Sequence, residues 1–230
     1  WIDAEWSFDK TWATLLGVDV DKLVLVKPEY GEQVIDITEG LVGADDLGVL
    51  VLDSIASMVP LAEIKGEADR MQVGGNSMIV GRFCRKVLMA MGTASKDGNY
   101  PTVLLVNQMR FKVGQMHGNP ESPPGGQALR HFSNMIIRTY GKDEIVKEVN
   151  PNVPSHKKIT ISMFKYKSPI TAKTAEFRMA LLPHAGNPVG HVDYWNTVMA
   201  YAKNFGYIAK SGSKWIFNEH EYPTLKEIQT

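Results

Sequence analysis

Residues 102–126 read T-V-L-L-V-N-Q-M-R-F-K-V-G-Q-M-H-G-N-P-E-S-P-P-G-G. The first five are mostly apolar and partly β-branched, which is typical of a buried strand. The run stops at Asn107 and Gln108, and open parallel sheets bind ligands outside the carboxyl ends of their strands. Residues 109–126 have no helical or strand period and contain glycines, prolines, two basic residues and several apolar ones. Such a long segment is usually functional or disordered. The sequence therefore leaves open a mobile surface loop and a loop ordered by a polymeric ligand.

The composition limits the classes of protein to which the chain can belong. Its 230 residues are enough for one large domain, or for one domain with an appendage. Lysine and arginine together number 25, as do aspartate and glutamate, so the formal net charge is zero. Any nucleic-acid site must therefore be a local cluster of cations rather than a field of the whole molecule.

The single cysteine and the hydropathy indicate a compartment. Cys84 cannot form an internal disulfide, and its place in a helical pattern predicts a small core residue. Lack of structural disulfides is typical of a reducing compartment, so we expect the protein to be cytoplasmic. No apolar run approaches the roughly 18–20 residues that span a bilayer, so we expect no membrane partner.

Two further stretches place acidic residues at the ends of predicted strands. Residues 1–4 predict a short strand that ends at Glu5, although a solvated carboxylate is the plainer interpretation of Glu5. Residues 49–52 are V-L-V-L, and Asp53 and Ser54 follow. Four apolar residues closed by an acid are the pattern of a Walker B strand, whose carboxylate holds Mg²⁺ through water. Alone the pattern is weak, because many parallel strands end in aspartate.

The remaining periodicities alternate strands with helices. Helices are predicted at 9–16 with Asp9 as N-cap, at 31–42, at 75–91 and at 191–205. Further strands are predicted at 23–26, 135–139, 159–164 and 176–182, with loops at 63–72 and 141–154 and a small hairpin at 208–217. This order predicts an α/β domain with a mostly parallel central sheet at 1–183, and the start of a small α+β module at 184–230.

Short motifs occur in a fixed order along nearly the whole chain. They are W-I-D-A-E at 1–5, V-L-V-L-D-S at 49–54, A-E-I-K-G-E at 62–67, V-N-Q-M-R-F-K-V-G at 106–114, G-N-P-E at 118–121, G-G at 125–126, K-Y-K at 165–167 and A-E-F at 175–177. Each is weak alone, but N-Q-M-R-F-K-V-G, G-N-P-E and G-G at these spacings are strong together. The set resembles the bacterial RecA recombinase family and its phage relatives. That resemblance implies a RecA-like P-loop NTPase core that acts in homologous recombination, DNA repair and the SOS response to DNA damage.

The resemblance assigns an ATP site to the carboxyl edge of the sheet. It implies that Glu5 positions or deprotonates the attacking water, and that Asp53 is the Walker B acid for Mg²⁺. Gln108 would be the sensor that links the γ-phosphate to the DNA loop. The other implied nucleotide residues are Asp9 and Trp12 at adenine, Ser54 beside the Walker B acid, and Lys165 and Lys167. These lysines share one side of an extended chain. They would reach the ATP of a neighbouring subunit, whereas the plainer interpretation is a solvated strand edge.

The same resemblance implies a DNA site. The family coats single-stranded DNA as a homo-oligomeric helical filament and pairs it with homologous duplex DNA. Residues 109–126 match its second DNA loop and residues 63–74 its first. Within them, Arg110 and Lys112 would pair with phosphates, and Val113 would wedge between bases. The other residues that the resemblance places at DNA are Met109, Phe111 and Arg85. It also places there the backbone N–H groups of Gly125 and Gly126, which lie at a helix start. Such contacts carry no base code.

The sequence contains no G-x-x-x-x-G-K-[ST] P-loop. The resemblance leads us to expect that motif just before Trp1, so that this chain alone binds ATP poorly and its parent is a DNA-dependent ATPase. Two alternatives remain: a DNA-binding or regulatory paralogue without a P-loop, and a RecA-fold ATPase with another task. Glu5 and Gln108 count against the first alternative, and the DNA-loop motifs count against the second.

Overall fold

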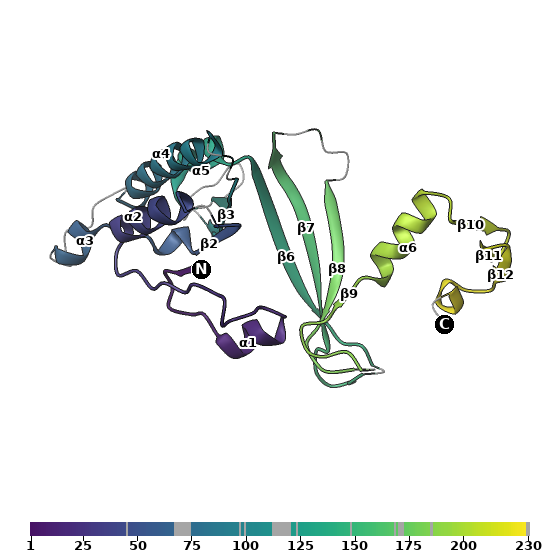
Figure 1. The fold of residues 1–230 in the computed structure, drawn as a ribbon. Helices are drawn as coiled ribbons and strands as arrows, with labels where there is room; N and C mark the ends of the chain where they lie inside the picture. Colours follow the sequence, from purple (N-terminus) through teal and green to yellow (C-terminus); the bar gives the residue numbers. More distant parts are fainter. Residues whose placement is uncertain are drawn as a thin grey trace. The chain divides into compact units, whose positions relative to one another are not determined.

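A computed structural model describes residues 1–44, 46–66, 75–96, 98, 100–111, 121–122, 124–147, 149–167, 169, 173–184 and 186–228. The chain forms two compact units, Trp1–Asn134 (unit 1) and Met135–Thr230 (unit 2), each of which is described by itself (Figure 1). The predicted domain boundary at residue 183 stays a prediction. Among the described helices, none combines the length and the hydropathy that a bilayer crossing requires.

Unit 1 contains the parallel sheet that the sequence predicts. Strands β1 (Ile2–Asp3), β2 (Val49–Asp53) and β3 (Thr102–Leu105) lie in the order β1-β2-β3, and both pairings are parallel. The strand predicted at 23–26 is wrong, because only Val26 pairs, as an isolated bridge to Ile2. Pro28 follows two residues later and has no N–H to donate, so the pairing does not extend.

The helices of unit 1 are α1 (Lys10–Leu15), α2 (Gly31–Val42), α3 (Leu61–Lys65), α4 (Gly75–Lys96) and α5 (Gly126–Phe132), with a 3₁₀ turn η1 (Ile55–Ser57). Figure 1 shows that α2, α4 and α5 lie close to the sheet and that α3 lies apart from it. The predicted helices at 9–16, 31–42 and 75–91 are confirmed, and α4 is longer than predicted. The loop predicted at 63–72 is wrong at residues 63–65, because α3 begins after Pro60 and ends at Lys65, with Gly66 as its C-cap. Residues 67–72 lie outside the described residues.

The core of unit 1 lies between α2, α4 and the sheet. Its largest fully buried side chains include Phe83 of α4, Ile35 of α2, and Leu50 and Leu52 of β2. Cys84 belongs to the same cluster, and burial raises the pKa of its thiol to about 11. Its place in this buried cluster confirms the predicted core role. The raised pKa keeps the thiol protonated at neutral pH.

Unit 2 is built on an antiparallel sheet. Its strands β6 (Met135–Glu144), β7 (His156–Tyr166), β8 (Thr174–Ala180) and β9 (Val192–Asp193) lie in that order. The helix α6 (Trp195–Asn204) follows, and then a small sheet of β10 (Ile208–Ser211), β11 (Lys214–Phe217) and β12 (His220–Tyr222), and the 3₁₀ turn η2 (Leu225–Ile228). The small hairpin predicted at 208–217 is confirmed by the pairing of β10 with β11. The loop predicted at 141–154 is wrong for residues 141–144, because β6 continues to Glu144 and pairs there with β7. The helix begins later than predicted, because β9 pairs with β8 and Asp193 then accepts a hydrogen bond from the backbone N–H of Trp195.

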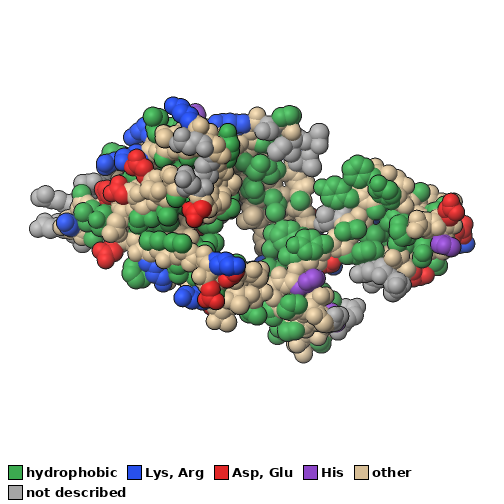
Figure 2. Space-filling view, in the orientation of Figure 1, with side chains coloured by type: hydrophobic (Ala, Val, Ile, Leu, Met, Phe, Trp, Pro, Cys, Tyr) green, Lys and Arg blue, Asp and Glu red, His purple; other side chains and the backbone are tan. Residues whose placement is uncertain are grey.

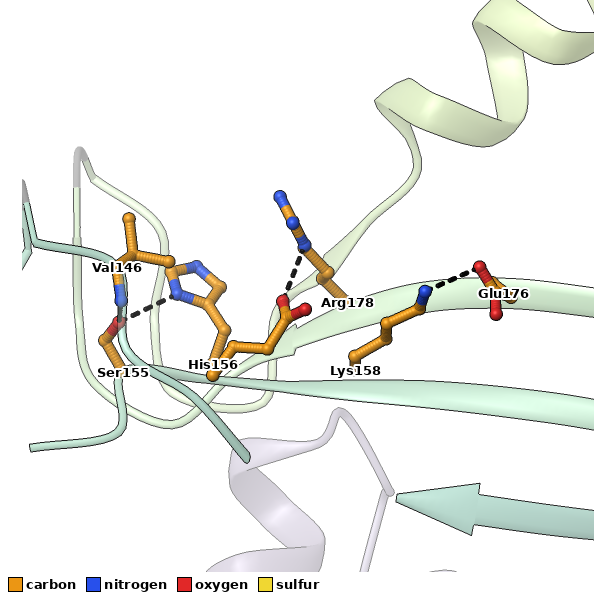
Figure 3. A network of polar contacts seen from close by, with 7 residues as sticks. Val146, Ser155, His156, Lys158, Glu176 and Arg178 are labelled. Carbon is orange, nitrogen blue, oxygen red and sulfur yellow. Dashed lines mark hydrogen bonds and ion pairs between the residues drawn. The ribbon is translucent and has the colours of Figure 1, made fainter. Parts of the chain in front are cut away.

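Polar side chains join the strands of this antiparallel sheet near its hairpin end (Figure 3). The Ser155 hydroxyl is buried, accepts from the backbone N–H of Val146 at 3.1 Å and lies 3.1 Å from His156 Nδ1. Two cross-strand ion pairs lie beside it, Lys158–Glu176 and Arg178–Glu144, each at 2.8 Å. The two ion pairs are partly exposed, so each contributes little to stability.

Candidate functional site

The carboxyl ends of the three parallel strands bring together side chains that are far apart in the sequence. Glu5 follows β1, Ser54 follows β2, and Gln108 follows β3. The register aligns Asp3 with Asp53 across the first two strands. Parallel strands end at the same edge of a sheet, and this edge is where open α/β sheets bind ligands.

One oxygen atom of Glu5 joins all three strand ends. Glu5 Oε1 accepts hydrogen bonds from the hydroxyl of Ser54, from Ser57 Oγ at 3.1 Å and from Gln108 Nε2 at 3.1 Å. The three donors are hydroxyl and amide groups, and together they fix the orientation of the half-buried carboxylate. This arrangement suits a carboxylate that polarises a water molecule.

The backbone around the cluster is held by further hydrogen bonds. Ser54 is fully buried, and the next residue, Ile55, donates its backbone N–H to the carbonyl of Val106 at 3.0 Å. Asn107 donates its side-chain amide to the carbonyl of Pro124 at 3.0 Å and accepts the backbone N–H of Gln108 at 2.9 Å. Asn107 thus connects the end of β3 to the residue before the Gly125-Gly126 pair.

Asp53 lies at the end of β2 in an acidic environment. Partial burial raises the pKa of its carboxyl above the ordinary value, and the charges of Glu5 and Asp3 raise it further. An ionised Asp53 is therefore disfavoured by its neighbours, and a cation placed beside it would relieve that repulsion.

The donors at this edge fit Mg²⁺ in their chemistry. They are carboxylate and hydroxyl oxygens, and Mg²⁺ usually takes one or two carboxylates and completes its octahedron with water and substrate phosphates. Asp53 is the residue that would hold it. Among the described residues, no group of three or more His, Cys, Asp or Glu side chains converges as a metal cage.

Asp3 is a buried carboxylate that sequence reasoning did not single out. Its side chain has no exposed surface, accepts the backbone N–H groups of Ser7 and Phe8 at 3.0 Å each, and lies 3.7 Å from Lys27 Nζ. These bonds hold the turn that leads from Glu5 into α1. Little in the sequence indicates this role, because Asp3 lies two residues before Glu5 and nothing in the pattern distinguishes a structural carboxylate from a functional one.

Asp9 and Trp12, predicted at adenine, lie at the start of α1. Asp9 is the N-cap, as predicted, and its side chain accepts the backbone N–H of Trp12 at 3.0 Å. The Trp12 ring is 37% exposed and so has a face free to stack. No described contact joins these two side chains to Glu5.

The predicted second DNA loop is described only at its two ends. β4 (Arg110–Phe111) pairs with β5 (Glu121–Ser122) in an antiparallel ribbon, so the predicted lack of strand structure is wrong at these residues. Met109 is 40% exposed at the base of the ribbon. The structure describes Arg110 and Phe111 only in their backbone. Lys112 and Val113 lie outside the described residues.

Gly125 and Gly126 end this segment and begin α5. Both have positive φ angles, +91° and +66°. A Cβ on Gly125 would lie 2.7 Å from Leu129 Cδ1 and 3.0 Å from Val80 Cγ1, so only glycine fits. The pair therefore brings the backbone of this loop against α4.

The exposed face of α4 carries cations. Arg82 and Arg85 are exposed on it, and Figure 2 shows Lys and Arg side chains over this part of unit 1. Lys86 lies beside them but pairs with Glu39 of α2 at 2.6 Å. Arg85, the predicted backbone contact, is thus available to a ligand.

Lys165 and Lys167 belong to unit 2. Lys165 lies near the end of β7 and is half-buried, and Lys167 follows the strand and is exposed. Their predicted role at a neighbouring subunit's ATP stays a prediction.

Sequence comparison identifies relatives of the whole chain. Residues 1–182 match the family model described as the RecA N-terminal domain. The protein RecA of Aquifex pyrophilus is 34% identical over 218 residues, which cover 95% of this chain and 58% of that relative. The protein RecA of Symbiobacterium thermophilum is 38% identical over 176 residues, which cover 76% of this chain and 48% of that relative. The chain thus spans about half the length of the curated relatives it matches. With four-fifths of its residues matched by the family model and a parallel sheet of the expected kind, the chain belongs to the RecA family.

Proposed function

We propose that this chain is part of a cytoplasmic recombination and DNA-repair protein that hydrolyses ATP while it is assembled on single-stranded DNA. The observation that carries the proposal is the 3.1 Å hydrogen bond from Gln108 Nε2 to Glu5 Oε1. It joins a carboxylate suited to activating water to the residue directly before the proposed DNA loop. A binding protein without catalytic activity has no use for this connection.

Each residue of the cluster has a role in the proposed reaction. Glu5 polarises the water that attacks the γ-phosphate. Asp53 would hold Mg²⁺, which would supply positive charge to offset that of the phosphates. Ser54 fixes the orientation of the Glu5 carboxylate. The chain's own contribution is therefore to place one water and to keep the surrounding charges in position.

Gln108 couples the nucleotide to DNA in this proposal. Its side-chain amide has two N–H donors, one of which binds Glu5. A γ-phosphate oxygen that draws the amide towards itself would weaken or break that bond. A change of partner would move the start of the segment 109–126. The occupancy of the ATP site would then determine the conformation of the DNA loop.

The partners follow from the remaining residues. We propose that Trp12 stacks on adenine beside Asp9, and that Lys165 and Lys167 reach the ATP of the adjacent subunit in a helical homo-oligomer. We propose that DNA is bound through its backbone and base faces, without a sequence code. The proposed DNA contacts are Arg85, Met109, Arg110, Phe111, Lys112, Val113, Gly125 and Gly126. Strand exchange with homologous duplex DNA is the corresponding activity of the whole protein.

A Glu5→Gln substitution in the full-length protein tests the proposal. The amide keeps the shape but cannot accept a proton, so DNA-stimulated ATP hydrolysis should fall by about 100-fold or more. Binding of ATP and assembly on single-stranded DNA, followed by fluorescence anisotropy, should persist. Glu29→Gln is the control, because Glu29 is exposed and outside the cluster. Unchanged hydrolysis in Glu5→Gln would refute the role of Glu5, and a full-length protein that binds no ATP would favour the paralogue without a P-loop.

A further inference from the structure

Glu5 presents two chemically different carboxylate oxygens. Oε1 accepts from Ser54, Ser57 and Gln108. Among the residues that the structure describes, none donates a hydrogen bond to Oε2. The carboxylate thus has one oxygen that serves as an anchor and one whose lone pairs remain available to an attacking water.

Ser57 is the donor that neither the sequence motifs nor the resemblance identified. It lies three residues beyond Ser54, at the last position of η1, and its hydroxyl is 3.4 Å from that of Ser54 and 3.1 Å from Glu5 Oε1. The two serines therefore approach the same oxygen from one turn. Gln108 approaches it from another strand.

The turn that carries Ser57 is itself fixed from two sides. The backbone N–H of Ser57 donates to the carbonyl of Ser54 at 3.2 Å, which closes the turn. The side-chain amide of Asn76, near the start of α4, donates to the carbonyls of Ile55 at 3.3 Å and Met58 at 3.1 Å. Ser57 is thus held on a braced segment rather than on a free loop, as a group that orients another must be.

We propose that Ser57 is a positioning residue for ATP hydrolysis, whose hydroxyl anchors Oε1 of Glu5 so that Oε2 faces the attacking water. The terminal torsion of a glutamate is broad, so a carboxylate held by a single donor samples many orientations. A second serine on the same oxygen narrows that range. The inference rests on the proposed function of Glu5, because Ser57 acts only through it.

Replacing Ser57 in the full-length protein gives a clear set of expected rates. In Ser57→Ala, kcat of DNA-stimulated hydrolysis should fall about tenfold while KM for ATP stays within about twofold, because orientation of the base matters in the transition state. Ser57→Thr should retain most of kcat because it keeps the hydroxyl, and Ser57→Val, of the same shape without the hydroxyl, should behave like Ser57→Ala. Ser95→Ala is the matched control, since the Ser95 hydroxyl donates to the carbonyl of Gly92 in its own helix and lies outside the Glu5 cluster.

The Thr and Val pair keeps the test decisive even if Ser57→Ala folds poorly, because the two variants differ only in the hydroxyl. Equal kcat in Ser57→Thr and Ser57→Val, or wild-type kcat in Ser57→Ala, would overturn the proposal.

A double variant separates this inference from the proposed function. Single-turnover rates of Glu5→Gln should not fall further when Ser57→Ala is added, because the carboxylate that Ser57 orients towards the water is already absent. If Glu5→Gln itself leaves hydrolysis intact, the proposed function fails, whereas a full loss in Glu5→Gln with no effect of Ser57→Ala rejects only the role of Ser57.

Discussion

Asp53 shows how a single residue can trade stability for function. Burial and the charges of Glu5 and Asp3 raise the pKa of its carboxyl, so the folded protein holds that proton more tightly than the unfolded chain does. We expect Asp53→Asn to raise the denaturant midpoint of the protein at neutral pH in the absence of Mg²⁺ and nucleotide, and to abolish ATP hydrolysis. Urea unfolding followed by circular dichroism, together with a turnover assay, checks both effects.

The difference in stability between Asp53→Asn and the wild-type protein should depend on pH, because the pKa of Asp53 is raised in the folded protein. A raised pKa means that folding takes up a proton, so stability falls as pH rises from the ordinary aspartate value through the raised one. Below that range the wild-type protein and Asp53→Asn should differ little. Above it, the full advantage of the Asn variant should be present. An Asn variant that is less stable than the wild type at every pH would contradict the repulsion argument.

Some residues of the candidate site could be predicted from the sequence, and others could not. Glu5, Asp53 and Gln108 follow apolar runs, and a strand that ends in a polar residue predicts a position at the sheet edge. Ser57 and Asp3 could not be found in this way. Ser57 points to Glu5 because of a 3₁₀ turn that has no periodic signal, and the bonds of Asp3 run to backbone N–H groups, which the sequence does not distinguish.

At the scale of elements, α4 organises unit 1 by being buried on one side only. Phe83 is 1% exposed in the core cluster, whereas Met89 on the same helix is 73% exposed. We expect Phe83→Ala to lower the free energy of unfolding by about 3–5 kcal/mol, through lost burial and the cavity that remains. Met89→Ala, the control, should change it by less than about 0.5 kcal/mol. Denaturant titration of both variants measures the free energy of unfolding. Similar losses in the two variants would contradict a helix that is buried on the Phe83 side and exposed on the Met89 side.

The elements that could be predicted are those with a long or clean period. Helix α2 was predicted with its observed bounds, because its apolar positions recur on one side over three turns. The segment 23–26 was wrongly assigned as a strand, because an apolar run does not show whether a partner with free N–H and C=O groups lies beside it. α3 was missed, because five residues are too few to show a helical period. The ribbon β4–β5 was missed because strands of two residues are too short to show an alternating pattern.

At the scale of the whole molecule, the balance of charge makes the proposed DNA binding depend on local cations. With 25 basic and 25 acidic side chains, there is no net field to hold a polyanion. We expect Lys112→Ala in the full-length protein to weaken binding to all single-stranded sequences alike. It should also lower the slope of log K against log salt by about 0.7–1, the value for one phosphate contact.

Titrations at several salt concentrations, on oligonucleotides of different composition, measure this effect. Lys22→Ala is the control, because the Lys22 side chain is 86% exposed and pairs with Asp19, three residues away. A loss of affinity that depends on base composition would contradict a phosphate contact for Lys112.

The strand order β1-β2-β3 also has a consequence for how the site forms in time. The bonds from Ser54 and Gln108 to Glu5 close loops of 49 and 103 residues, whereas the strands of unit 2 pair through hairpins. Loop-closure entropy must be overcome before distant contacts contribute, so we expect these bonds to form late in folding. Glu5 can thus acquire its full set of donors only in a chain whose parallel sheet is complete. A partly folded chain then carries the separate acidic residues but no assembled cluster with which to activate water.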